Sequence, residues 1–368
     1  MSTIAIDATY AVDPRPTGVS VYSRRLIESL AELESSHRFL VGYRASRWRR
    51  RHDLPQFNHR FGGMRARFSA CLFQNPWTFW LPWRAELFHS VAQRPAPFRF
   101  RKEVVTILDV FPLTGRDYST PDFRRKFSAL LIEAAARADR IITPSQYTAD
   151  ELVRHAAADK EKIRVIPLGV DPVPEAALRN GASTREPRQE DGTDLILEVG
   201  VVQTRKNTLG AIQAFERLPA RYRMAIVGGD GYGSEAVHDY IRRAGLADRV
   251  KVMGYVPAEE VRRLYRTARV LLFPSLEEGF GLPVLEAMAH GLPVVTSATS
   301  SLPEVGGDAV LYCDPRDERD VAEKTLQAAE DQKLRQEMIE KGLARAREFT
   351  WRRTAQQTLR VYDEALIE

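Results

Sequence analysis

The chain has 368 residues, which is too long for one ordinary domain and suits two domains of roughly 150–200 residues each. Its composition, 44% hydrophobic and 28% charged, is that of a globular protein, and no apolar run is long enough for a transmembrane helix. The net charge of +5 favours phosphate-bearing ligands, nucleic acid or an anionic membrane without choosing among them. The first residues lack the pattern of a secretory signal, and two cysteines without metal-site spacing favour a cytoplasmic location.

The first half of the chain alternates short apolar runs with helical patterns. Strands are expected at residues 3–7, 38–41, 87–90, 104–108, 140–143 and 163–166, and helices at residues 19–33, 121–138 and 149–155. Several of these strands are continuous runs of Val, Ile and Leu, which is typical of parallel strands covered on both faces. The alternation predicts a doubly wound α/β domain.

The second half repeats this pattern after a polar segment. Residues 179–194 contain almost no apolar side chain, and we expect them to link a first domain, 1–178, to a second domain, 195–350. Further strands are expected at 195–199, 223–227, 250–253, 270–273, 294–296 and 309–312, and helices at 209–218, 234–244, 258–268, 283–290 and throughout the tail from 320 to 368. Two Rossmann-like domains of this kind would face a cleft at the carboxyl ends of their strands, where ligands bind in open α/β sheets.

The most informative segment follows the strand that ends at Phe273. It reads Pro-Ser-Leu-Glu-Glu-Gly-Phe-Gly-Leu-Pro and continues into a helix that contains Glu286. Gly279 and Gly281 let backbone amides approach a ligand, and with the N-terminus of the helix they form an anion site suited to a diphosphate. Glu278 and Glu286 would repel phosphate, but a carboxylate can accept hydrogen bonds from the hydroxyls of a sugar or a ribose. The alternative is that both carboxylates only cap and solubilise the helix.

This segment resembles the Glu-x7-Glu signature of the retaining glycosyltransferases of family 4, which have the two-domain GT-B fold. The resemblance implies that Glu286 holds the ribose of a nucleotide-sugar donor and that Glu278 contacts the transferred sugar. It also implies that backbone amides of Phe280, Gly281 and Leu282 meet the diphosphate or the sugar. By the same resemblance, the last helix, 351–368, is expected to return and complete the first, acceptor-binding domain.

A second motif, Val-Gly-Val-Val-Gln-Thr-Arg-Lys-Asn, follows the strand expected at 195–199. Its Arg205 and Lys206 stand where a helix begins, and two cations there suit a diphosphate leaving group whose charge grows during transfer. The family carries an Arg/Lys pair in this role, often after a proline that Thr204 replaces here. The alternative is a solvated basic turn.

The first half carries weaker matches to the family. Gly18 lies in a loop that resembles the glycine loop over the donor phosphate, although a plain strand-to-helix turn is the alternative. Asp109 is a candidate catalytic group or the cap of the next turn; Leu108 precedes it where the family commonly has a His near the donor sugar. The remaining candidates are Tyr22 and Ser145 on the acceptor side and Val256, in a stretch that resembles the one whose backbone meets the donor base.

No Asp-x-Asp motif, the metal–diphosphate signature of the other major glycosyltransferase fold, occurs in the chain. We therefore expect no metal and no cofactor, with Arg205, Lys206 and helix dipoles supplying the electrostatic stabilisation.

Eight arginines lie between Arg44 and Arg67 against a single acidic residue, Asp53, and Trp77, Trp80 and Trp83 follow. A basic patch beside exposed aromatic residues suits an anionic membrane surface or a lipid-diphosphate acceptor. The alternative is a solvated basic loop followed by a buried aromatic helix.

These patterns and the resemblance predict a retaining, metal-independent hexosyltransferase that uses a GDP- or UDP-sugar, with GDP-mannose as the family habit. The expected acceptor is a glycan or a lipid-linked glycan of polysaccharide or cell-surface synthesis, and the expected location is cytoplasmic or peripheral on the inner face of the membrane. Nucleic acid is not an expected partner. The alternatives are a sugar-nucleotide epimerase or phosphorylase of the same fold, and a non-enzymatic nucleotide-sugar-binding protein.

Overall fold

The computed structural model describes residues 1–13, 17–53, 68–72, 81–96, 98–174 and 194–367. The chain forms two compact units. Unit 1 comprises Met1–Gly115, Pro121–Gly169 and Trp351–Glu368, and unit 2 comprises Arg116–Thr120 and Val170–Thr350. Nearly all of the predicted linker 179–194, and residues 54–67 of the basic stretch with Trp77 and Trp80, lie outside the described residues.

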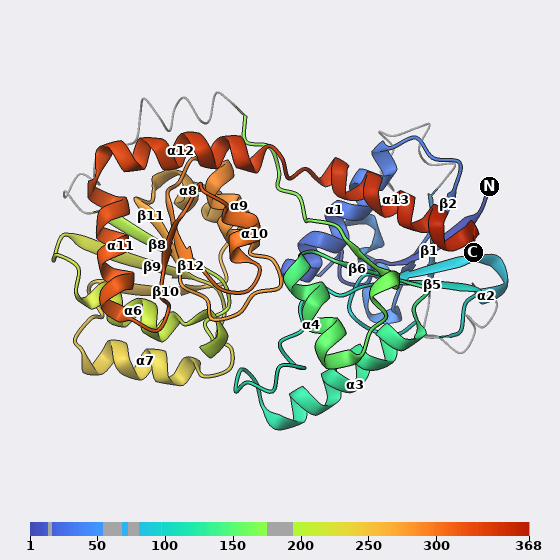
Figure 1. The fold of residues 1–368 in the computed structure, drawn as a ribbon, viewed down its shortest axis with the longest axis horizontal. Helices are drawn as coiled ribbons and strands as arrows, with labels where there is room; N and C mark the ends of the chain where they lie inside the picture. The colour runs from blue at the N-terminus through green and yellow to red at the C-terminus, as the bar shows by residue number, and fades with distance from the viewer. Residues whose placement is uncertain (14–16, 54–67, 73–80, 97, 175–193, 368) are drawn as a thin grey trace. The chain divides into compact units, whose positions relative to one another are not determined.

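Unit 1 is built on a sheet whose described strands have the order β3-β2-β1-β4-β5-β6-β7 and pair in parallel throughout. The strands are β1 (Thr3–Asp7), β2 (Arg38–Tyr43), β3 (Phe68–Leu72), β4 (Leu87–Ser90), β5 (Lys102–Thr106), β6 (Arg140–Thr143) and β7 (Ile163–Val165). The helices are α1 (Gly18–Glu32), α2 (Leu81–Arg84), α3 (Pro121–Arg137), α4 (Gln146–Ala156) and α13 (Trp351–Ile367), with the 3-10 helices η1 (Ala45–Asp53) and η5 (Lys160–Lys162). Helices α1 and α13 cover one face of the sheet, and α3 and α4 cover the other (Figure 1).

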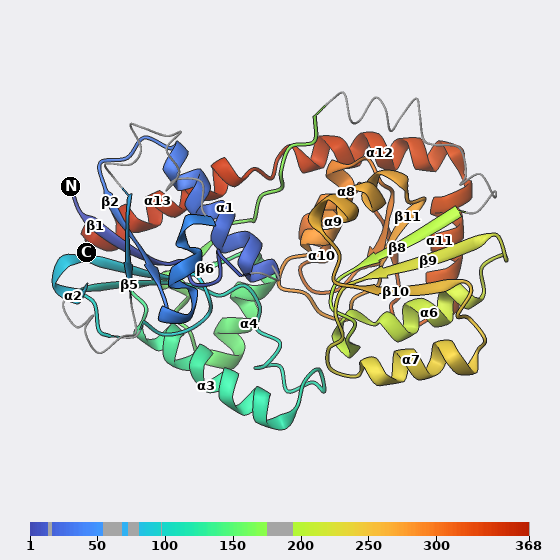
Figure 2. The ribbon, with the colours of Figure 1, turned by 180° about the vertical axis from the view of Figure 1, so that it is seen from behind.

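Unit 2 contains a second parallel sheet, in the order β10-β9-β8-β11-β12-β13. Its strands are β8 (Asp194–Val199), β9 (Tyr222–Val227), β10 (Val250–Gly254), β11 (Val270–Phe273), β12 (Val294–Ser297) and β13 (Leu311–Cys313). Its helices are η6 (Thr204–Lys206), α6 (Thr208–Glu216), α7 (Ser234–Arg243), α8 (Ala258–Thr267), α9 (Leu282–Ala289), α10 (Leu302–Gly306), α11 (Glu318–Glu330) and α12 (Gln332–Ala346). Helices α6 and α7 cover one face, and α8, α9 and α12 cover the other (Figure 2).

Apolar burial on both faces of each sheet explains why these strands form. Ile141 and Ile142 of β6 are buried, as are Leu271 and Leu272 of β11, so successive residues that point to opposite faces are both covered. Each such side chain contributes about 1.5–3 kcal/mol by leaving water. The predicted fold class, two Rossmann-like doubly wound domains, is confirmed.

Several details differ from the sequence prediction, among them three strands. Strand β5 ends at Thr106, not at Leu108, because Ile107 and the residues after it turn into the loop in which the Asp109 carboxylate caps the next turn. Strand β13 begins at Leu311, since Ala309 still closes a turn onto Gly306. The strand β3 was not expected, because its Ser-Ala-Cys centre weakens the apolar pattern.

A buried hydrogen-bond chain ties helix α13 to the sheet of unit 1. His89 on β4 lies 2.6 Å from the Tyr362 hydroxyl through Nδ1 and 2.8 Å from Thr106 Oγ1 through Nε2. Thr106 Oγ1 in turn lies 2.8 Å from the Tyr22 hydroxyl on α1. Burial lowers the pKa of His89 to about 3, so the imidazole is neutral in the folded state. The chain therefore joins α1, β4, β5 and α13 without a buried charge.

The buried histidine of this hydrogen-bond series makes the stability of unit 1 dependent on pH. Unfolded His89 binds a proton below its ordinary pKa of 6.5, whereas folded His89 does not, so stability present above pH 6.5 is lost as the pH falls. The wild type should have a larger free energy of unfolding than His89→Asn, and we expect this difference to shrink by about 2 kcal/mol between about pH 7.5 and pH 5. Urea titration followed by hydrogen exchange in unit 1 measures it. His238→Asn, which removes a half-buried histidine of unit 2, is the control, and a constant His89→Asn difference would contradict the expectation.

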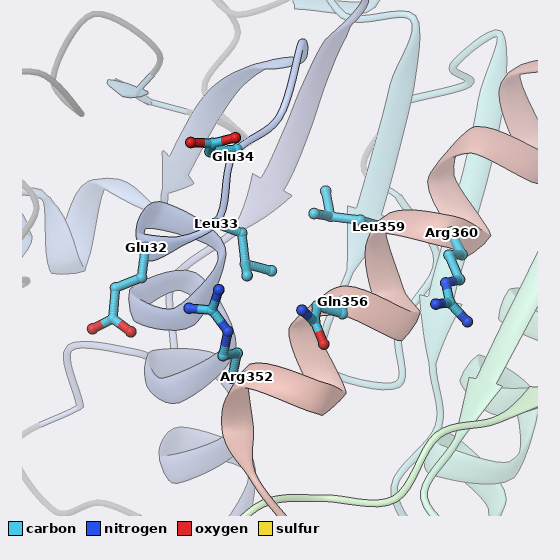
Figure 3. Close-up of a pocket in the computed structure, with 7 residues that line it drawn as sticks. All are labelled: Glu32, Leu33, Glu34, Arg352, Gln356, Leu359 and Arg360. Atoms are coloured by element: carbon cyan, nitrogen blue, oxygen red, sulfur yellow. The ribbon is translucent and has the colours of Figure 1, made fainter.

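A groove of about 480 Å³ opens between the end of α1 and helix α13 (Figure 3). Leu33 and Leu359 supply its apolar part, and Arg352 extends from α13 toward α1. Helix α1 starts after the carboxyl end of β1 and runs back, so its last turn lies at the opposite edge of the sheet. The groove is therefore away from the edge at which ligands bind in open α/β sheets.

Candidate donor site in unit 2

The main predicted site residues follow two neighbouring strands of unit 2. Strands β8 and β11 pair in parallel, so their carboxyl ends lie at the same edge of the sheet. The 3-10 helix η6 carries Arg205 and Lys206 a few residues after β8, and the loop after β11 carries Glu278. The backbone N–H of Leu276 donates to the carbonyl of Arg205 at 2.9 Å, which joins the two segments directly.

Glu278 is buried and binds both cations of the pair. Arg205 Nη1 lies 3.2 Å from Glu278 Oε2, and Lys206 Nζ forms an ion pair with Oε1. Burial alone would raise the pKa of Glu278, but Lys206 and Arg205 outweigh it and hold that pKa below its usual value. Lys206 Nζ also lies 4.9 Å from the centre of the Phe273 ring. The structure thus assembles one ionised carboxylate and two cations at the predicted position.

The turn that carries the cations is tightly fixed. Thr204 N–H donates to the Tyr232 carbonyl at 2.9 Å, and Asn207 adopts a left-handed conformation, φ 59°, between η6 and α6. The Asn207 amide donates to the Pro315 carbonyl at 2.6 Å, and Arg205 Nη1 donates to the Glu277 carbonyl at 2.6 Å. Arg205 is only 7% exposed, which is incompatible with the alternative of a solvated basic turn.

Two further buried carboxylates stand next to this cluster. Glu277 is fully buried and its Oε2 accepts from Arg116 at 2.9 Å, within the same compact unit. Glu198, inside the apolar strand β8, accepts from the Thr208 hydroxyl at 2.7 Å, while burial raises its pKa to about 7. Neither was predicted as a site residue, although a glutamate within the run Leu-Ile-Leu-Glu-Val is a visible signal in the sequence.

The loop ends in the glycine that begins helix α9. Gly281 has φ 115°, and a Cβ there would lie 2.8 Å from a methyl group of the buried Leu302, so both backbone and space favour glycine. Ser301 Oγ donates to the carbonyls of Glu278 and Phe280, each at 2.8 Å. Gly279 and Phe280 are buried and Leu282 half-buried at this helix start. The loop therefore leads its backbone past the Glu278 cluster into the N-terminus of a helix, the arrangement that favours anions.

Glu286 lies one turn into helix α9 and is half-buried. Its Oε2 accepts a hydrogen bond of 2.8 Å from the Tyr265 hydroxyl, and burial raises its pKa to about 7. Glu286 and Glu278 thus differ in charge at neutral pH, because only Glu278 has cationic partners. A group poised between ionised and neutral forms can exchange hydrogen bonds with hydroxyl groups.

The predicted residues of unit 1 occupy varied positions. Gly18 is exposed and begins helix α1. Asp109 is half-buried, and its Oδ1 accepts from the Phe111 N–H at 3.1 Å, which is the capping alternative for this residue. Leu108 is 9% exposed. Gly18 is therefore the residue of this set that is most accessible to a ligand.

Tyr22 and Ser145, the acceptor-side candidates, lie in the core of unit 1. Tyr22 is fully buried and bonds Thr106, while Ser145 caps helix α4 through a hydrogen bond from the Thr148 N–H. Their structural roles account for their polar groups without an acceptor. In unit 2, Val256 is half-buried directly after β10, beside the 51% exposed Tyr255.

Two other features are absent from the described residues. No group of three or more His, Cys, Asp or Glu side chains in the described parts of the chain is arranged to hold a metal ion. None of the helices described here combines the length and the apolar character needed to cross a membrane.

Two family models match the chain, Glycosyltransferase Family 4 over residues 16–173 and Glycosyl transferases group 1 over residues 182–345. O-antigen chain mannosyltransferase B of Escherichia coli is 32% identical over 272 residues, which cover 72% of this chain and 71% of that protein. D-inositol 3-phosphate glycosyltransferase of Segniliparus rotundus is 32% identical over 64% of this chain but only 54% of its own length.

Solved structures share the fold at low sequence identity. Sucrose-phosphate synthase from Thermosynechococcus elongatus superposes with a TM-score of 0.75 at 19% identity, over 99% of both chains. Anabaena HepE in complex with UDP and glucose gives a TM-score of 0.72 at 16% identity, over 99% of this chain and 100% of that one. At this level of sequence identity, the similarity shows that the fold is shared and does not identify the substrates.

Proposed function

Since the chain belongs to glycosyltransferase family 4, we propose that it moves a hexose from a nucleoside diphosphate to a glycan or lipid-linked acceptor, with retention of anomeric configuration. The observation that carries this proposal is the buried cluster of Arg205, Lys206 and Glu278 beside the start of helix α9. Two cations and a helix N-terminus suit a diphosphate, and the carboxylates suit sugar and ribose hydroxyls.

The proposed reaction needs electrostatic stabilisation more than a strong base. The acceptor hydroxyl oxygen bonds to the anomeric carbon on the leaving-group side, the bond from that carbon to the phosphate oxygen breaks, and the hydroxyl proton passes to the departing phosphate. Arg205 and Lys206 neutralise the charge that grows on this phosphate. Because Glu278 and the loop carbonyls already orient them, little reorganisation is required at that moment. In this proposal the two side chains fill the role of a metal ion.

Within the proposal, each remaining residue has a distinct role. Glu286 accepts hydrogen bonds from the donor ribose, and Glu278 orients the transferred sugar while keeping the cations in place. The amides from Gly279 to Leu282 contact the diphosphate, and Val256 contacts the base. The mannosyltransferase relatives favour mannose, and therefore GDP-mannose, as the donor. The same relatives favour a polysaccharide acceptor.

Transfer assays with GDP-mannose and UDP-glucose test this function. We expect glycoside formation with one donor, in the presence of EDTA, and an anomeric configuration in the product that matches the donor by NMR. Inverted product would overturn retention, and full dependence on a divalent cation would overturn metal independence. Epimerised donor or a requirement for inorganic phosphate would instead establish the epimerase or phosphorylase alternative, and donor binding without turnover would establish a binding protein.

We further propose that the stretch from Arg44 to Arg67 brings unit 1 to the anionic inner face of a membrane. In its described part, η1 exposes Arg49, while Arg50 pairs with Asp53 at 2.9 Å. Trp83 on α2 is 87% exposed, but α2 precedes the amino end of β4 whereas η1 follows the carboxyl end of β2, so Trp83 lies at the opposite edge of the sheet. The exposed arginine of η1 is what suits an anionic surface.

Flotation with phosphatidylglycerol vesicles at low salt measures this contact. Replacing Arg49, Arg50 and Arg51 with alanine is expected to weaken binding roughly 100-fold, since each basic residue near an anionic surface contributes about 1 kcal/mol. The control replaces three exposed arginines of unit 2, Arg242, Arg243 and Arg319, so that net charge changes equally. No flotation of the wild type, or equal losses in both triple variants, would refute the membrane contact.

A further inference from the structure

Tyr265 reaches the carboxylate of Glu286 from a neighbouring helix. It lies on α8, is only 2% exposed, and its hydroxyl donates to Oε2 of Glu286 on α9 at 2.8 Å. Burial and the adjacent Glu286 raise the pKa of Tyr265 well above its usual value, so the hydroxyl keeps its proton and acts as the donor.

The ring of Tyr265 is itself held in place. It stacks on the imidazole of His290, with centroids 5.2 Å apart and ring planes 24° from parallel. His290 closes the C-terminus of α9, where its Nδ1 lies 2.8 Å from the Glu286 carbonyl. Tyr265 thus fixes the side chain of Glu286, and His290, at the end of the same helix as Glu286, fixes Tyr265.

We propose that Tyr265 is a positioning residue that presents the Glu286 carboxylate to the ribose of the donor. The inference rests on the proposed function, in which Glu286 binds that ribose. A free glutamate side chain loses rotamer entropy when it binds, so a carboxylate that is held in advance binds a diol more tightly. The Tyr265 hydrogen bond uses one oxygen and leaves the other lone pairs for the two ribose hydroxyls.

The same hydrogen bond affects the ionisation of Glu286. The ionisable groups that act on Glu286 are Tyr265 and Asp171, and those that act on the adjacent His290 are Arg266, Arg262 and Asp171. Burial raises the pKa of Glu286, Asp171 raises it further, and only the bond from Tyr265 lowers it. Burial lowers the pKa of His290, so the imidazole adds no charge at neutral pH. Loss of the Tyr265 hydroxyl therefore shifts Glu286 toward its neutral form.

The test compares Tyr265→Phe with the wild type in binding of GDP and of 2′,3′-dideoxy-GDP by calorimetry, with the UDP pair as a second probe. Phenylalanine keeps the stack on His290 and removes only the hydroxyl. We expect Tyr265→Phe to bind GDP about 5–10-fold more weakly, a loss within the range of one ordinary hydrogen bond, and to bind the dideoxy nucleotide as the wild type does. A purely structural role would weaken both nucleotides equally, and that result would overturn the inference.

The pH dependence gives a second readout. Wild-type affinity for GDP should rise as Glu286 ionises near pH 7, and in Tyr265→Phe this rise should move to higher pH. Glutamine does not titrate, so Glu286→Gln should lack this rise. Its absence would assign the rise to the ionisation of Glu286. An unmoved midpoint in Tyr265→Phe would count against the inference.

The matched control is Tyr222→Phe. Tyr222 is also buried, and its hydroxyl also donates to a glutamate, Glu330, at 3.2 Å in the same unit. This variant should discriminate between GDP and the dideoxy nucleotide as the wild type does. If the wild type itself binds the two nucleotides equally, the ribose role of Glu286 fails; if it discriminates and Tyr265→Phe discriminates equally well, only the inference fails.

Discussion

Replacing Lys206 with methionine is expected to lower kcat by about 10²–10³-fold, the loss seen when one oriented group that stabilises transition-state charge is removed. Methionine preserves most of the aliphatic stem, which lies near Gly200, and removes the ammonium that lies over the Phe273 ring, so the change is mainly one of charge. Binding of the donor should weaken less than turnover, because the charge on the leaving phosphate grows only as the glycosidic bond breaks. Steady-state transfer kinetics, together with calorimetric donor binding, separate the two effects.

Lys251→Met is the control for Lys206→Met. Lys251 is exposed on β10 of the same unit, so its loss changes net charge by the same amount without touching the cluster. Near-normal turnover of Lys206→Met in a folded protein would remove the lysine from the proposed mechanism. A fall in donor affinity equal to the fall in kcat/KM, with kcat unchanged, would instead assign Lys206 to ground-state binding.

Glu286→Ala should raise the KM for the nucleotide sugar by about 10–100-fold while changing kcat little. The carboxylate is proposed to bind the ribose, which does not react, so its hydrogen bonds are equally strong before and during transfer. The wild-type KM should also improve as the pH rises through about 7, because burial raises the pKa of Glu286 to that value and the ionised carboxylate accepts hydrogen bonds more strongly. Initial-rate measurements across pH check both points.

Glu323→Ala is the comparison for Glu286→Ala, since Glu323 is an exposed carboxylate on helix α11. It should leave both KM and its pH dependence unchanged. If Glu286→Ala lowers kcat instead of raising KM, the carboxylate acts on the reacting sugar, and the roles proposed for Glu278 and Glu286 would have to be exchanged.

Much of the fold could be predicted because its strands are continuous apolar runs. β1, β4, β6 and β11 have the predicted bounds, since each has an apolar centre or start whose side chains are buried. β3 could not be predicted, because it is formed by its pairing with β2, a tertiary contact that the composition of the segment does not indicate. The division of the tail into helices was also missed; Asp331, whose side chain accepts from the Leu334 N–H, ends one helix and caps the next.

The candidate site divides in the same way between local and long-range features. Arg205, Lys206, Glu278 and Glu286 could be named because they lie within two short motifs. The partners of these residues could not, since Tyr265 meets Glu286 across 21 positions and Arg116 meets Glu277 across 161. The acceptor-side candidates show the converse limit. The positions of Tyr22 and Ser145 in the sequence predict acceptor-side residues, and only the structure shows that both are buried within the core of unit 1.

The attachment of helix α13 to unit 1 also has a consequence for biosynthesis. Tyr362 lies at one end of the buried hydrogen bonds through His89 and Thr106, so unit 1 lacks helix α13 until residues 351–367 have left the ribosome. Residues 194–350 emerge earlier and contain every strand described for the sheet of unit 2, with helices that cover it. We therefore expect the unit encoded later to finish folding first, and a nascent chain that stops before Trp351 to leave the earlier unit exposed to chaperones and proteases.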